Sequence, residues 1–61
     1  MKKFLKHNGQ HIVIETHVDP DGFWATVPDR PGCTTQADSA EELVKNLHEV
    51  IDLWDEELGS S

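Results

Sequence analysis

The sequence is poor in the features that anchor, export or crosslink a small protein. Cys33 is the only cysteine, so no disulfide can form within the chain, and a lone thiol is typical of a reducing compartment. No apolar run approaches the roughly 20 residues that a helix needs to span a bilayer. The amino-terminal lysines are not followed by an apolar stretch of signal-peptide length. We therefore expect a cytoplasmic protein without a membrane segment.

Basic side chains are also scarce. Five Lys and Arg residues stand against twelve Asp and Glu residues, which gives a formal net charge of −7. Because Lys and Arg contacts with phosphate supply most nucleic-acid affinity, direct binding of DNA or RNA is not expected. A basic partner protein suits this charge, since complementary charge speeds encounter and disfavours wrong partners. The acidity can also serve solubility alone, and both interpretations stay open.

The length of 61 residues allows one domain, expected at residues 1–58 and followed by a disordered tail at 59–61. A domain of this size buries only about 60% of the surface that its unfolded chain exposes. Small domains that lack disulfides or a metal often gain stability from a partner chain. Association with further subunits is therefore expected.

The alternation of apolar residues predicts a sheet in the first half of the chain. Residues 11–18 and 23–28 read as strands with one apolar face each, joined by the turn residues 19–22. A four-residue loop sets Val18 opposite Phe23 and His17 opposite Trp24, and a slip of one residue would send one apolar set into water. A third short strand is expected at 33–37. The Asn8-Gly9 turn also predicts an edge strand at 3–7, with Leu5 opposite Ile12.

A single amphipathic helix is expected after Ser39. Ser39 and Glu42 match the capping box, and Gly59 is placed to end the helix. The apolar stripe of this helix consists of Ala40, Leu43, Val44, Leu47, Val50, Ile51, Trp54 and Leu58. The predicted fold class is α+β, an antiparallel sheet of three to four strands covered on one face by one C-terminal helix.

The other face of this sheet has nothing in the chain to cover it. Exposed apolar patches on small domains commonly mark partner sites. Trp24 on that face is either an anchor for a partner or a side chain packed against the end of the sheet. Our candidate residues for a partner or oligomer interface are Val13, Glu15, His17, Trp24, Thr26 and Leu53.

Residues that carry chemistry do not form a recognisable catalytic or metal-binding pattern. His11 and His17 lie about 20 Å apart on one strand, so the histidines are expected to be solvated rather than to bind metal. Cys33 at a strand start is expected to fill core, and Asp19 and Asp21 to form a turn. We expect no enzyme activity, no cofactor and no metal.

Several motifs together resemble the HicB-like antitoxin family. They are the sequences at residues 21–25 (DGFWA), 27–33 (VPDRPGC) and 35–43 (TQADSAEEL), in that order and spacing. The resemblance covers roughly residues 12–57. It implies a β-β-β-α domain related to a degraded ribonuclease H-like core, without nuclease activity.

The resemblance also implies a function. HicB proteins neutralise HicA toxins, which are small basic mRNA-cleaving ribonucleases, and they form dimers or tetramers. The alternative is an orphan homo-oligomeric module without a toxin partner. Ala37 stands where the family usually has Gly. Full antitoxins add a carboxy-terminal DNA-binding segment, which we expect this short, stand-alone domain to lack, so operator binding is not expected.

Overall fold

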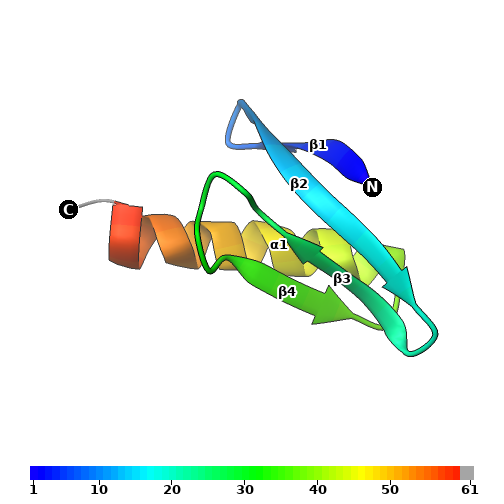
Figure 1. The fold of residues 1–61 in the computed structure, drawn as a ribbon. Helices are drawn as coiled ribbons and strands as arrows, with labels where there is room; N and C mark the ends of the chain where they lie inside the picture. Colours follow the sequence, from blue (N-terminus) through cyan, green and yellow to red (C-terminus); the bar gives the residue numbers. More distant parts are fainter. Residues whose placement is uncertain (60–61) are drawn as a thin grey trace.

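The computed structural model describes residues 1–59, which fold into one antiparallel sheet and one helix (Figure 1). The predicted α+β class is confirmed, with four strands in the spatial order β1-β2-β3-β4. The elements are β1 (Lys2–His7), β2 (Gln10–Asp19), β3 (Gly22–Thr26), β4 (Thr34–Ala37) and α1 (Ala40–Trp54), followed by a π-helical turn, η1 (Asp55–Gly59).

The β1–β2 hairpin is closed by the Asn8-Gly9 turn. Asn8 has φ of 50° and Gly9 has φ of 79°, and positive φ at both positions is what the tight turns of hairpins require. Leu5 pairs with Ile12, as predicted from the sequence. The predicted edge strand is therefore confirmed.

The β2–β3 hairpin has the predicted register, with His17 opposite Trp24 and Val18 opposite Phe23. Pairing continues to Asp19 and Gly22, so the turn is two residues shorter than the predicted loop. Gly22 has φ of 149°, and a Cβ there would lie 2.8 Å from the Ala37 carbonyl oxygen. Only glycine allows β4 to end this close to the hairpin.

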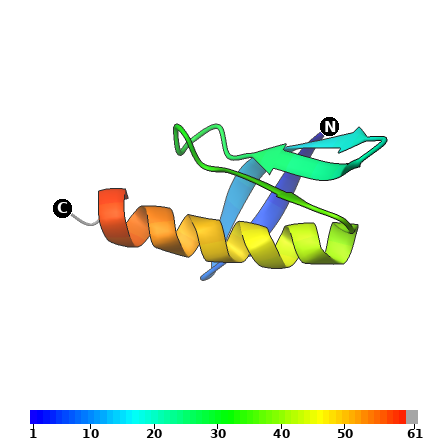
Figure 2. The same cartoon turned by 90° about the horizontal axis from the view of Figure 1, so that it is seen from below.

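The helix lies along one side of the sheet, which makes two layers (Figure 2). Between them lie the buried apolar residues Leu5, Ile12, Ile14, Ala25, Val27, Cys33, Leu43, Leu47 and Ile51. Cys33 belongs to this core, as expected. Val18 does not, because it is 74% exposed. It lies near the β2–β3 turn, which extends past the N-terminal end of α1 in Figure 1.

The N-terminus of α1 has the predicted cap, because the Ser39 hydroxyl accepts a hydrogen bond from the Glu42 N–H at 3.2 Å. The regular α-helix ends at Trp54, earlier than predicted, and η1 continues to Gly59. Three consecutive carboxylates begin there, at the negative end of the helix dipole, and η1 itself contains no basic residue. The rest of the predicted tail, residues 60–61, lies outside the described residues.

Candidate functional site

The sheet surface turned away from α1 is the first candidate site. Residues that pair directly across an antiparallel sheet share a face. The register therefore defines this surface, here called the open face, as Lys2, Phe4, Lys6, His11, Val13, Glu15, His17, Asp19, Trp24, Thr26, Thr34 and Gln36. The structure thus brings together the predicted candidates Val13, Glu15, His17, Trp24 and Thr26.

Trp24 and His17 form the aromatic centre of the open face. Their rings stack with centroids 3.9 Å apart and an interplanar angle of 13°. Both side chains are half-buried, and a shallow depression beside Trp24 is lined by Asp19, Thr34, Thr35 and Gln36. The stacking orders the indole, and an ordered, partly exposed tryptophan loses little entropy when a partner covers it.

Phe4 extends the apolar part of the open face and was missed by the sequence analysis. It pairs with Val13 and is 70% exposed. The predicted pairing of Leu5 with Ile12 already placed Phe4 opposite Val13, so the signal was present in the register. A large apolar side chain at this exposure adds to the surface that a second subunit can bury.

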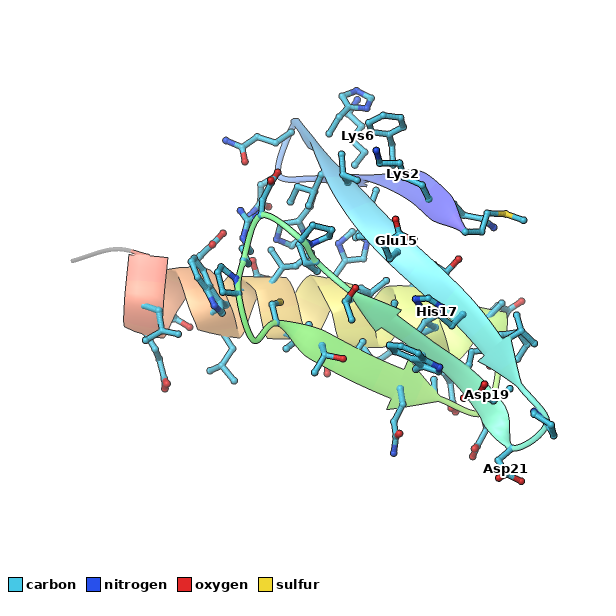
Figure 3. The ribbon with its side chains drawn as sticks, in the orientation of Figure 1. Lys2, Lys6, Glu15, His17, Asp19 and Asp21 are labelled. Atoms are coloured by element: carbon cyan, nitrogen blue, oxygen red, sulfur yellow. The ribbon has the colours of Figure 1, made fainter. Side chains whose placement is uncertain are left out.

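Most charges on this side of the sheet lie toward its two ends, and Glu15 lies between them (Figure 3). Lys2 and Lys6 lie at the β1 end, whereas Asp19 and Asp21 lie at the β2–β3 hairpin end (Figure 3). Two copies related by a two-fold axis that lies in the plane of the open face, perpendicular to the line joining its two ends, would place the positive end of each against the negative end of the other. The face is therefore electrostatically self-complementary.

Leu53, the remaining interface candidate, lies elsewhere. It is on α1, 53% exposed, beside a shallow groove between β4 and the helix. A second hollow shares Val50 and Leu53 with it, and the two together are here called the β4–α1 groove. Its lining residues are Gly32, Cys33, Thr35, Asn46, Glu49, Val50, Leu53, Trp54, Glu57 and Leu58. The six predicted residues therefore mark two separate surfaces.

The helical segment carries most of the acidity of the protein. Between residues 40 and 59, Lys45 is the only Lys or Arg. The carboxylates of this segment are Glu41, Glu42, Glu49, Asp52, Asp55, Glu56 and Glu57. In contrast, β1 contains three lysines and no acidic residue. The negative field is consequently strongest on the α1 side, away from the open face.

A buried histidine corrects the expectation that all four histidines are solvated. His7 is 6% exposed, because it shares the inner face of β1 with Leu5. Its Nδ1 lies 2.6 Å from Nδ1 of His48, and its Nε2 lies 2.6 Å from Oδ1 of Asp52. His48 and Asp52 lie four residues apart on α1, a spacing that places both on one helix face.

This cluster is built to hold the fold rather than to react. The ionised Asp52 carboxylate can only accept, so the His7 Nε2–H donates to it, and one of the two facing Nδ1 atoms donates while the other accepts. His7 uses opposite ring nitrogens for its two partners, so one metal ion could not replace both contacts. No group of metal-ligating side chains with suitable geometry occurs within residues 1–59.

Two further groups border the C-terminal end of α1. Arg30 donates from Nε to Asp55 Oδ1 at 2.8 Å and from Nη2 to Oδ2 at 3.3 Å, and its hydrogen bonds hold the pKa of the Asp55 carboxyl below the ordinary value. Burial raises the pKa of the Cys33 thiol above its ordinary value. Cys33 is therefore a neutral thiol at physiological pH, and a neutral thiol is a poor nucleophile.

Comparisons with known proteins identify relatives of this chain. The family model described as HicB-like antitoxin of bacterial toxin-antitoxin systems matches residues 10–60. A UPF0150 protein of Archaeoglobus fulgidus is 48% identical over 44 residues, which cover 70% of this chain and 61% of that protein. A UPF0150 protein of Helicobacter pylori is 41% identical over 44 residues, which cover 72% of this chain and 58% of that protein.

The matched segment therefore spans about three fifths of the length of these relatives. No solved structure matches the chain. Within residues 1–59, no helix has the length and apolar character needed to cross a membrane. The family match covers most of the sequence, including β2, β3, β4 and α1. The chain belongs to the HicB-like antitoxin family.

Proposed function

We propose that this protein is a non-catalytic antitoxin that binds a small basic toxin of the HicA type and covers its RNA-binding surface. Membership of the antitoxin family supports this function. The observation that carries it is the concentration of carboxylates along α1 and η1, where Lys45 is the only Lys or Arg. A basic ribonuclease must present positive charge to its RNA, and an acidic helix competes for that surface.

The test is co-expression with the small basic HicA-like protein encoded nearest to this chain's gene. We expect the toxin alone to stop growth, and the pair to grow and to co-purify as a complex. The affinity should fall steeply as salt is raised, because charge complementarity is screened. Absence of both a complex and growth rescue would contradict the proposal.

The proposal also includes the absence of direct nucleic-acid binding. Fluorescence anisotropy with labelled RNA and DNA duplexes at about 0.1 M salt should show no binding by this chain alone. The same probes should bind the toxin and be released when this chain is added. Binding of either duplex by this chain alone would contradict this part of the proposal.

A second candidate function is a homo-oligomeric module, a dimer or tetramer without a toxin partner. The self-complementary charges of the open face favour it, together with the exposed side chain of Phe4 and the partly exposed Trp24. Sedimentation at several concentrations should then show a dimer that Phe4→Asp or Trp24→Ala converts to monomer. A wild-type chain that stays monomeric at millimolar concentration would contradict this candidate.

A further inference from the structure

The two edge strands of the sheet are protected to different extents. β1 carries Lys2, Lys3 and Lys6, and charged side chains discourage another strand from pairing with an edge. β4 consists of Thr34, Thr35, Gln36 and Ala37, with neither a charge nor a proline. Among the described strands, β4 has a neighbour only on its β3 side. The edge that is open to an added strand is therefore β4.

The register shows which peptide groups this edge offers. The Val27 N–H donates to the Cys33 carbonyl at 3.0 Å, and pairs in an antiparallel ladder alternate, so Thr35 also faces β3. Thr34 and Gln36 consequently direct their peptide groups outward. Asn46 Nδ2 donates to the Gln36 carbonyl at 3.2 Å, which agrees with this direction. The N–H and C=O of Thr34 and the N–H of Gln36 are therefore the groups that can form hydrogen bonds with an added strand.

A strand added at this edge would lie beside the β4–α1 groove. Alternate side chains of a strand point to opposite faces, so every second side chain would contact Val50 and Leu53. Leu53 is 53% exposed, and Val50 packs partly against the core. An open edge beside an apolar groove is the arrangement by which proteins bind extended peptide segments.

Charge identifies the kind of segment that fits. Glu49 and Glu57 line the groove, and it has no Lys or Arg in its lining. Neither carboxylate forms a salt bridge with another residue of the described chain. A second copy bound through a two-fold axis at β4 would bring like carboxylates together, which is unfavourable. A segment that carries Lys or Arg would meet opposite charge.

We propose that the β4–α1 groove binds an extended basic segment of the partner protein by strand addition. The backbone of this segment pairs with Thr34 and Gln36, its apolar side chains contact Val50 and Leu53, and its basic side chains face Glu49 and Glu57. The inference rests on the proposed function, because it takes the basic toxin as the partner. It assigns the surface that the toxin uses.

The test measures binding of a catalytically inactive form of the HicA-like toxin by calorimetry, with three groove variants of this chain. Leu53→Asp places a charge in the apolar contact and should weaken binding at least tenfold. The pair Glu49→Lys and Glu57→Lys should weaken it at least tenfold at low salt and less at high salt. Gln36→Pro removes an outward N–H that the fold does not use, and should weaken binding about threefold to tenfold.

Val44→Asp, at an exposed position of α1 outside the groove, is the matched control for Leu53→Asp and should change the affinity less than twofold. Trp24→Ala reports on the open face. The melting temperature of each variant shows whether it folds. If Gln36→Pro does not fold, Leu53→Asp still tests the groove, because Leu53 is exposed and its replacement should leave the fold intact. A complex that is sensitive to Trp24→Ala but not to the groove variants overturns the inference and leaves the proposed function standing. A complete lack of complex overturns both. Self-association lost on Leu53→Asp in the absence of toxin would identify a second copy as the occupant and overturn the inference.

Discussion

The helix contacts the two halves of the sheet by different physical means. Over β3 and β4 the contact is apolar. Leu47 and Ile51 are fully buried there, together with Ala25, Val27 and Cys33. Such contacts are non-directional and grow with the area removed from water, so this half supplies most of the free energy of folding.

Over β1 the buried side chain of Leu5 is joined by polar contacts that are specific in geometry. His7 bonds to His48 and Asp52, and Asn8 adds a longer contact to the same carboxylate at 3.5 Å. Hydrogen bonds contribute less net free energy than apolar burial, but they fix direction. Because β1 carries Phe4 and the lysines of the open face, the polar half positions that face. Stability and the placement of the open face therefore depend on different contacts.

Among the variants that test this difference, we expect the largest loss of stability from Leu47→Ala, in the apolar contact between α1 and the strands β3 and β4. Leu47 has no exposed surface, and removal of a buried leucine costs about 2–5 kcal/mol. Because the core of a domain shorter than about 70–80 residues rarely supplies more than about 3–5 kcal/mol of stability, the variant should be partly unfolded at room temperature. Urea denaturation followed by tryptophan fluorescence measures the change.

Val44→Ala is the control for this experiment, because Val44 is on the same helix and 44% exposed. It should cost less than about 1 kcal/mol. Equal losses for the two variants would contradict the assignment of Leu47 to the core that stabilises the fold.

A smaller effect is expected from His7→Ala in the polar half. The substitution removes two hydrogen bonds and a buried ring, and should lower the free energy of unfolding by about 1–3 kcal/mol. His11→Ala, at an exposed position of the same hairpin, should leave it unchanged. His7→Leu separates the causes, since it keeps apolar volume. If His7→Leu were as stable as the wild type, the hydrogen bonds would have no net role.

Much of the fold followed from the sequence because its signals were local or paired. Alternation set the faces of β2 and β3, the register followed from keeping apolar sets together, and Ser39 with Glu42 marked the helix start. The strand faces and the helix start depend on residues that are near one another in the chain, and the register depends only on how β2 pairs with β3.

The predictions that were wrong concern residues whose surroundings depend on how the helix packs against the sheet. His7 was expected to be solvated, although its register with Leu5 put it on the inner face, because nothing local showed that His48 and Asp52 would meet it. Val18 follows the apolar alternation yet lies near a turn that the helix does not reach.

Hydrogen exchange tests the comparison within a single strand, because β2 pairs with β1 on one side and β3 on the other. The Thr16 N–H donates to the Met1 carbonyl, so alternation directs the Ile12 and Ile14 amides to β1 and the Glu15 and His17 amides to β3. We expect the amides that face β1 to exchange about tenfold faster than those that face β3, because the contacts between β1 and α1 stabilise the fold less than those of β3 and β4. Equal protection would show that the sheet opens as one unit.

The smallest effect is expected from Arg30→Ala, which removes the salt bridge to Asp55 at the end of α1. The pair is partly exposed, so solvent screens it, and the melting temperature should fall by less than it does for His7→Ala. Since the pKa of Asp55 is lowered in the folded state, this contribution is present above the ordinary value of 3.8 and is lost as the pH falls through the folded value. The gap in melting temperature between wild type and variant should therefore be widest at neutral pH and narrow toward about pH 2. Asp55→Asn should show the same narrowing. A gap that stays constant with pH would mean that Arg30 acts through its contact with the Trp54 ring, whose centroid lies 5.8 Å from the guanidinium carbon, and not through charge pairing.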